Sequence, residues 1–264
     1  MIRFFRNIRK KLLQQNRFSK YLLYAIGEIA LVMIGILLAL QVNNWNEHRK
    51  SKKMANEIYQ NLLTSLKQDS VEVQRTIDLL SKSLETKRKM ITEGPKQIPK
   101  DLKQSELDEM VRNISGAVMS FFPKTGVYDL VVSNNGMDLL ESQEIKAALI
   151  NLYDFQYKRY ENVDHIIDNK YHYYLGPLIR KDIGFIGAYD SESNFEILTH
   201  VSRNQFIDHY EQLVSESQDI YGILSTGNNY LIQIRKSIHE LLYLIRNELN
   251  PKYSLEHFAH GADD

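Results

Sequence analysis

The sequence predicts an all-α protein, with one N-terminal transmembrane helix followed by an elongated antiparallel helical bundle. Three observations support this prediction. An apolar run near the N-terminus is long enough to cross a bilayer. The 264 residues include only 5 Pro and 12 Gly, which favours long uninterrupted elements. Beyond the apolar run, hydrophobic residues recur every three, four or seven positions, as on one face of an amphipathic helix.

The chain divides into four segments: a basic amphipathic segment at 1–20, a transmembrane helix at 21–42, a helical domain at 43–250 and a tail at 251–264. Seven basic and no acidic residues lie in the first segment, whereas residues 43–264 carry 26 basic and 32 acidic ones. This split indicates contact with a lipid bilayer and not with nucleic acid, because an acidic domain repels phosphate. The absence of cysteine excludes disulfides and thiolate chemistry.

The predicted membrane helix has one charged residue, Glu28, between Leu22 and Leu40. Nineteen residues span roughly 29 Å, close to the thickness of the hydrocarbon core. A buried core helix is one alternative, although such helices are seldom apolar on every side. A cleaved signal peptide is the other, but no small-x-small cleavage site precedes Asn43. We therefore expect an uncleaved anchor, with Trp45 as an aromatic residue at the membrane interface.

Basic residues on the two sides of the span predict its orientation. Seven lie in the twenty residues before it, and only four, between Arg49 and Lys53, lie just after it. The positive-inside rule then places the N-terminus in the cytoplasm and the helical domain outside. Residues 2–13 fit a short amphipathic helix on the inner leaflet, or equally a basic tail that only sets the topology.

Helical signals continue beyond the span. No Gly or Pro occurs from Asn43 to Glu93, so one helix continuous with the membrane helix is expected, ending at Gly94-Pro95. Its apolar stripe consists of Leu66, Val73, Ile77, Leu80, Leu84 and Ile91. A capping box at Ser105–Asp108 predicts a second helix to Ser115. A short helix at 127–133 is expected to end in a left-handed cap at 134–136.

The second half of the domain contains two longer predicted helices. Ser142 is expected to cap a helix that Gly176-Pro177 stops just after Leu175. Residues 182–200 are the least helical stretch and could form a loop or a short hairpin. A final helix is expected from Ser202 to Leu249, with a candidate kink at 227–229.

Two stretches carry a family resemblance. Residues 26–47, IGEIALVMIGILLALQVNNWNE, resemble the N-terminal signature of a family of uncharacterised single-pass inner-membrane proteins of gram-negative bacteria. Residues 126–153, GVYDLVVSNNGMDLLESQEIKAALINLY, are similar to a second stretch of that domain-of-unknown-function family. The resemblance implies a bacterial inner-membrane protein with an external helical domain. Together with the charge bias, this places the domain in the periplasm. It implies no activity.

A candidate contact face follows from helical spacing within the span. Glu28, Gly35, Ala39 and Asn46 share one face, and Gly35-x-x-x-Ala39 is a small-x-x-x-small step that lets another helix approach. A carboxylate at this depth costs about 2.5–3.5 kcal/mol on insertion scales, which favours a role within a helix–helix contact. The alternatives are that Glu28 reaches the cytoplasmic headgroups, or that it relays protons.

A tyrosine stripe is the candidate ligand site of the helical domain. It consists of Tyr153, Tyr157, Tyr160, Tyr171 and Tyr174. Such a stripe can line a groove for a peptide or glycan, but in a helical bundle these residues more often belong to the core, which we expect here.

Candidate metal ligands gather on the same helix. Asp164, His165, Asp168 and His172 lie within nine residues, and the last two are one turn apart. Surface side-chain pairing explains this spacing as well, so no metal is predicted. His239-Glu240 begins like a zinc-protease motif, but Tyr243 stands where the second histidine is required.

No phosphate-binding loop, dinucleotide-binding turn or nucleophile elbow occurs in the sequence. We therefore predict neither an enzyme nor a cofactor. The sequence favours a membrane-anchored interaction or scaffold protein of the bacterial envelope that self-associates or binds partner membrane proteins. The alternative is an extracytoplasmic ligand-sensing module. Because only about twenty residues are predicted in the cytoplasm, such a module would have to signal through a partner.

Overall fold

The computed structural model describes residues 18–94, 101–115, 120–192 and 194–250. The chain forms two compact units, Met1–Ala55 and Asn56–Asp264, which are described separately. Helix α2 (Phe18–Glu93) contributes to both and confirms the predicted unbroken helix. It ends before Gly94, whose φ of +74° is readily adopted only by glycine. Residues 1–17 of the basic segment predicted at 1–20 and the whole tail at 251–264 lie outside the described residues.

The first unit is dominated by the apolar part of α2. An 18-residue window in this helix has a mean hydropathy of 2.3, and none of the window is buried within the structure. By length and composition the helix qualifies as a membrane span, although a signal sequence would meet the same test. A core helix of a soluble domain would be mostly buried, so the absence of buried residues from this window argues against that alternative.

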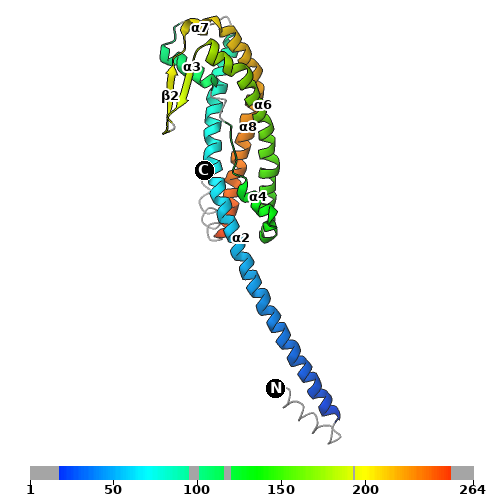
Figure 1. Ribbon diagram of the computed structural model, residues 1–264. Helices are drawn as coiled ribbons and strands as arrows, with labels where there is room; N and C mark the ends of the chain where they lie inside the picture. Colours follow the sequence, from blue (N-terminus) through cyan, green and yellow to red (C-terminus); the bar gives the residue numbers. More distant parts are fainter. Residues whose placement is uncertain (1–17, 95–100, 116–119, 193, 251–264) are drawn as a thin grey trace, which may run out of the picture. The chain divides into compact units, whose positions relative to one another are not determined.

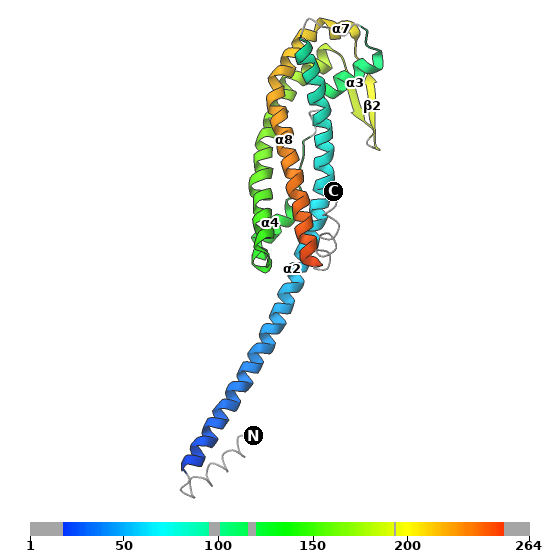
Figure 2. The ribbon, with the colours of Figure 1, turned by 180° about the vertical axis from the view of Figure 1, so that it is seen from behind.

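The second unit is a helical bundle (Figures 1 and 2). One column contains α5 (Gln143–Ile150), the π-helical turn η3 (Asn151–Tyr157) and α6 (Lys158–Lys170). Helix α8 (Tyr210–Leu249) lies between this column and α2, and it runs antiparallel to both. Gly227 lets α8 approach α6 closely, because a Cβ atom there would lie 3.0 Å from Ile167 Cδ1. The helix continues without interruption through the candidate kink.

The predicted stop at Gly176-Pro177 is wrong. Helical backbone continues through the π-helical turns η4 (Tyr171–Leu175) and η5 (Leu178–Asp182), and it ends near Gly184, which has φ +78°. A proline ring in an α-helix clashes with the carbonyl group four residues earlier. The wider π-helical turns on both sides of Pro177 change that spacing, which allows the chain to pass through it.

The least helical stretch forms a hairpin, one of the two predicted alternatives. Strands β1 (Ile186–Tyr189) and β2 (Phe195–Thr199) are antiparallel, with a register irregularity between Ile186 and Gly187. The predicted helix from Ser202 is divided into α7 (Arg203–Asp208) and α8. His209, with φ −105° and ψ 8°, interrupts the helical geometry between them.

The smaller helices cover the bundle. They are α3 (Gln104–Ser115), α4 (Gly126–Ser133) and the 3-10 turn η2 (Gly136–Leu139). The predicted left-handed cap is confirmed, because Asn135 has φ 54°. The capping box at Ser105–Asp108 is wrong: α3 begins one residue earlier, and the Glu106 carboxylate accepts the Lys103 N–H at 2.7 Å. Ser142 does cap α5, by accepting the Ile145 N–H at 3.3 Å.

The buried face of α2 is partly polar. Leu66, Val73, Ile77 and Leu80 are buried as predicted, whereas Leu84 and Ile91 are only half-buried. The face continues instead through Ser83, Lys87 and Met90, and it includes Asp69 and Thr76. A second group of buried apolar side chains lies around α3, η4, η5 and the beginning of α8. The two buried charged residues of this helix, Asp69 and Lys87, therefore require hydrogen-bond partners from elsewhere in the chain.

Candidate functional site

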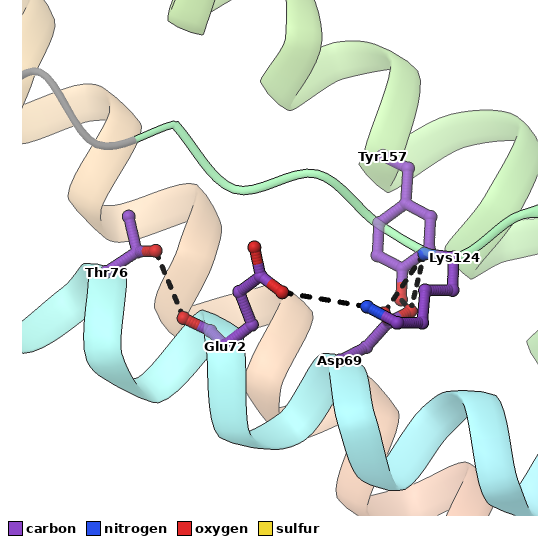
Figure 3. Close-up of polar contacts among 5 residues, drawn as sticks. All are labelled: Asp69, Glu72, Thr76, Lys124 and Tyr157. Carbon is purple, nitrogen blue, oxygen red and sulfur yellow. Dashed lines mark hydrogen bonds and ion pairs between the residues drawn. The ribbon is translucent and has the colours of Figure 1, made fainter. Parts of the chain in front are cut away.

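The candidate site is built around Asp69, a fully buried carboxylate on α2 (Figure 3). The backbone N–H of Lys124 donates to both of its oxygens, at 3.0 and 3.3 Å. The Tyr157 hydroxyl donates to Oδ2 at 3.0 Å. The Lys124 ammonium lies 3.7 Å from Glu72, one turn along α2. Asp69 thus connects the segment before α4 and the helix η3 to α2.

Burial raises the pKa of Asp69 above its ordinary value of 3.8, even though the two donors favour the charged form. The nearby Glu72 carboxylate acts in the same direction as burial. Burial also raises the pKa of Tyr157 far above its ordinary range, so its hydroxyl stays protonated and available to donate. Asp69 thus belongs to a buried polar network in which burial opposes the charged form of its carboxyl group.

Aromatic rings extend this network along the helical column. Tyr128 on α4 stacks on Tyr153, with centroids 4.3 Å apart and planes 3° apart, and its hydroxyl donates to Asp154 at 2.6 Å. Tyr153 packs edge to face against Tyr157 at 5.1 Å, and Phe121 meets Tyr157 at 5.7 Å. The Tyr153 hydroxyl is buried without a hydrogen-bond partner among the described residues.

A pocket of about 400 Å³ opens beside these rings, and we call it the tyrosine pocket. Its aromatic lining consists of Phe121, Phe122, Tyr128, Tyr153, Tyr157 and Tyr160. Its charged lining consists of Asp129, Asp154, Glu161, Asp164 and Lys158. Lys158 lies 2.9 Å from Asp154, so its charge is already paired. The pocket is therefore apolar on its walls and negative overall.

The predicted tyrosine stripe is divided by the structure. Tyr153, Tyr157 and Tyr160 are buried and line the tyrosine pocket, whereas Tyr171 is buried beside a second pocket. Tyr174 is 58% exposed and lines neither. The π-helical turn η4 explains this difference, because more residues per turn rotate later side chains away from the stripe. The expectation that the stripe is core is confirmed for its first four members.

The cluster of candidate metal ligands does not converge. The Tyr160 hydroxyl donates to Asp164 at 2.8 Å, and the Ser120 hydroxyl lies 3.5 Å from Asp168. His172 packs against the Tyr171 ring with centroids 5.6 Å apart. Within the described ranges, no three His, Asp or Glu side chains are placed to hold a metal ion.

The predicted contact face of the apolar helix is uncovered. Gly35 and Ala39 are exposed and Glu28 and Asn46 half-exposed, and a Cβ atom on Gly35 would meet nothing within 4 Å. Trp45 is 65% exposed, with the Arg49 guanidinium 5.4 Å from its ring centroid. A second helix therefore has room to approach this face.

Sequence reasoning missed three buried charged residues. Lys87 is fully buried, and its ammonium donates to Ser83 at 3.0 Å and to the Ile114 carbonyl at 2.6 Å; burial lowers its pKa to about 7. Asp108 is 2% exposed, and its carboxylate accepts the backbone N–H of Val201, two residues after β2.

The third of these residues, Asp69, did have a signal in the sequence. It lies three residues after Leu66 and four before Val73, within the apolar stripe.

Comparison with known proteins places the chain in a family. Residues 28–174, more than half of the chain, match the family described as "Family of unknown function (DUF6090)". The chain belongs to this family. The family region contains Asp69 and every residue that lines the tyrosine pocket. No curated protein and no solved structure matches the chain.

Proposed function

We propose that this protein is a membrane-anchored interaction or scaffold protein of the bacterial envelope. The observation that carries the proposal is the apolar part of α2, which is exposed on all sides and has a small-residue face at Gly35 and Ala39. Such a helix lowers its free energy by entering a bilayer, and its small residues favour a close contact with another helix. The partner is a second copy of the chain or another membrane protein.

The proposed topology has the N-terminus in the cytoplasm and the bundle in the periplasm, anchored in the inner membrane. The basic bias of residues 3–20 supports this orientation. A reporter that is active only outside the cytoplasm, fused after Asp264, is expected to be active. Activity of a cytoplasm-only reporter at the same site would reverse the orientation.

Cysteine crosslinking tests the contact face without background, because the chain has no cysteine. Asn46→Cys in membranes should give a crosslinked product, either a dimer or an adduct with a partner. Adding Gly35→Leu should abolish it, because bulk at the small-residue face separates the backbones. Ala30→Leu is the matched control, because it adds bulk on the opposite side of the helix. Equal crosslinking in all three proteins would reject the contact face.

A second candidate function is supported by the tyrosine pocket: an extracytoplasmic module that senses a small molecule and acts through a partner. A pocket of about 400 Å³ that combines aromatic walls with charged side chains has the size and the mixed lining of a ligand site. Native mass spectrometry of the purified chain should detect a bound molecule. Thr125→Trp, just before α4, should displace it by filling the pocket, whereas Ser133→Trp, at the end of α4 and outside the pocket, should retain it. Identical spectra of the two variants would reject this function.

A further inference from the structure

A second pocket, of about 320 Å³, lies between α2, α3, η5 and the hairpin. Its apolar lining is formed by Leu79, Tyr171, Ile179, Phe185, Ile186 and Phe195. Its charged lining comprises three cations and one acid: Lys82, Arg112, Arg180 and Glu109. We call it the basic pocket. Its positive charge stands out, because residues 43–264 as a whole carry more acidic than basic side chains.

The hairpin holds Arg112 in place. The Arg112 guanidinium lies over the Phe195 ring, 4.2 Å from its centroid, as in a cation–π contact. The Phe195 ring in turn covers Gly187 on the neighbouring strand, where a Cβ atom would lie only 2.2 Å from Phe195 Cζ. A side chain at position 187 would displace the ring. The glycine, the ring and the guanidinium thus form one stack.

A separate set of contacts holds Arg180. Its guanidinium interacts with the Tyr171 hydroxyl, and a Cβ atom on Gly176 would lie 2.8 Å from Nη1. Arg180 therefore packs back over a helical turn that has no side chain at position 176. Both arginines are oriented by neutral groups, an aromatic ring in one case and a phenol in the other.

The charges of these residues are not balanced locally. Within the described part of the chain, Lys82, Arg112 and Arg180 form no ion pair with a carboxylate. Two guanidinium groups fixed beside an apolar cavity match the planar, bidentate geometry of a carboxylate or phosphate group. Asn113 and Ser115 add polar groups to the lining.

We propose that the basic pocket binds an organic anion, with a carboxylate or phosphate head between Arg112 and Arg180 and a compact apolar body against Ile179 and Phe185. The volume limits that body to about the size of one ring or a short chain. A nucleic acid requires a longer positive surface than three side chains provide. The inference goes beyond the proposed function, because it depends neither on the membrane helix nor on the tyrosine pocket.

The test compares benzoate with benzamide, which has a similar shape without the charge. The full chain in lipid nanodiscs is titrated with each while ligand-observed NMR or calorimetry follows binding, and inorganic phosphate tests the head alone. Benzoate is expected to bind, and both benzamide and phosphate to bind at least about tenfold more weakly. Benzamide lacks the negative charge, and phosphate lacks the apolar body.

Variants show whether binding occurs at this pocket. Arg180→Gln and Arg112→Gln should each weaken benzoate binding about tenfold, since each removes a charge-assisted contact. Gly176→Ala should weaken it without removing any charge, because the new methyl group displaces Arg180. Glu109→Gln should strengthen binding, which a merely damaged fold would not do. Arg88→Gln is the matched control, because Arg88 is exposed on α2 and does not line the pocket.

Three results would overturn the proposal. One is equal affinity for benzoate and benzamide, which would identify an apolar site without charge recognition. Another is phosphate binding as tightly as benzoate, which would leave the apolar body without a role. The third is an unchanged benzoate affinity in both arginine variants, which would place any binding elsewhere on the chain.

Discussion

Asp69 and Asp108 are both buried aspartates, and they differ in the direction in which their surroundings shift the pKa. Each is at most 2% exposed, and each accepts a backbone N–H from a distant segment, Lys124 for Asp69 and Val201 for Asp108. Each also accepts a side-chain donor, the Tyr157 hydroxyl at 3.0 Å or the His200 ring at 2.7 Å. The pKa of Asp69 is nevertheless raised, and that of Asp108 is lowered.

The neighbours explain this difference. At Asp69, burial outweighs the donors, and the Glu72 carboxylate adds a like charge. At Asp108, burial also opposes ionisation, but the Val201 amide, the His200 ring and the Gln104 side chain together outweigh it. The His200 ring is 68% exposed, so this second site lies next to solvent. Low exposure alone therefore does not determine the direction of the pKa shift; the number and charge of the partners do.

The largest expected effect comes from replacing each aspartate by asparagine, which removes its charge, and comparing the free energies of unfolding. Asp108→Asn should lower the free energy of unfolding at pH 7 by about 1.5–3 kcal/mol, because it removes charge-assisted hydrogen bonds. Asp69→Asn should cost less than about 1 kcal/mol, because burial opposes the charged form that the substitution removes. Denaturant unfolding of residues 50–264, followed by circular dichroism, measures both. A larger loss at Asp69 would show that the comparison is wrong.

The pH dependence should have opposite signs at the two sites. The raised pKa of Asp69 contributes stability below its ordinary value of 3.8, and this is lost as the pH rises through the higher folded-state value. The lowered pKa of Asp108 contributes stability above 3.8, and this is lost as the pH falls through the lower value. As the pH rises from about 3 to about 6, the wild type should therefore lose stability relative to Asp69→Asn. Over the same rise it should gain stability relative to Asp108→Asn. Thermal unfolding across this range checks the two slopes, and parallel slopes would contradict the assignment.

Effects smaller than that of Asp108→Asn are expected when the side-chain donors are removed. Tyr157→Phe removes a buried donor to Asp69 and should cost about 1 kcal/mol, because the carboxylate keeps only the Lys124 amide. His200→Ala removes a largely exposed partner and should cost no more than about 0.5 kcal/mol. The same unfolding assay resolves the order of the two variants. The reverse order would show that the exposed hydrogen bond between His200 and Asp108 matters more than the buried network.

Much of the secondary structure could be predicted from short-range signals. The unbroken helix before Gly94, the cap at Ser142 and the left-handed residue at Asn135 depend on residues within one or two turns. The stop at Gly176-Pro177 failed because π-helical turns are not recognisable from hydrophobic period or from proline alone. The same π-helical turns explain why Tyr174 is exposed and does not lie on the predicted stripe.

The tyrosine pocket could be predicted in part. A regular helical spacing brought Tyr153, Tyr157 and Tyr160 to one face, and the structure keeps them together. Tyr128 and Phe121 could not be added, because they reach the pocket from a different segment of the chain. Asp69 lies within the apolar stripe on α2, but its partners could not be predicted, because Lys124 and Tyr157 lie 55 and 88 residues away.

The sequence by itself determined that the protein is helical, that one helix is long and apolar enough to span a membrane, and where several of the helices begin or end. These properties follow from period, composition and capping, which act over a few residues. Only the tertiary structure decided which charges are buried and what they bind, and it alone brought Arg112, Phe195 and Gly187 into one stack. The physical reason is that hydrogen bonds and ring contacts between distant segments depend on how the chain packs. The spacing of residues within one helix does not determine that packing.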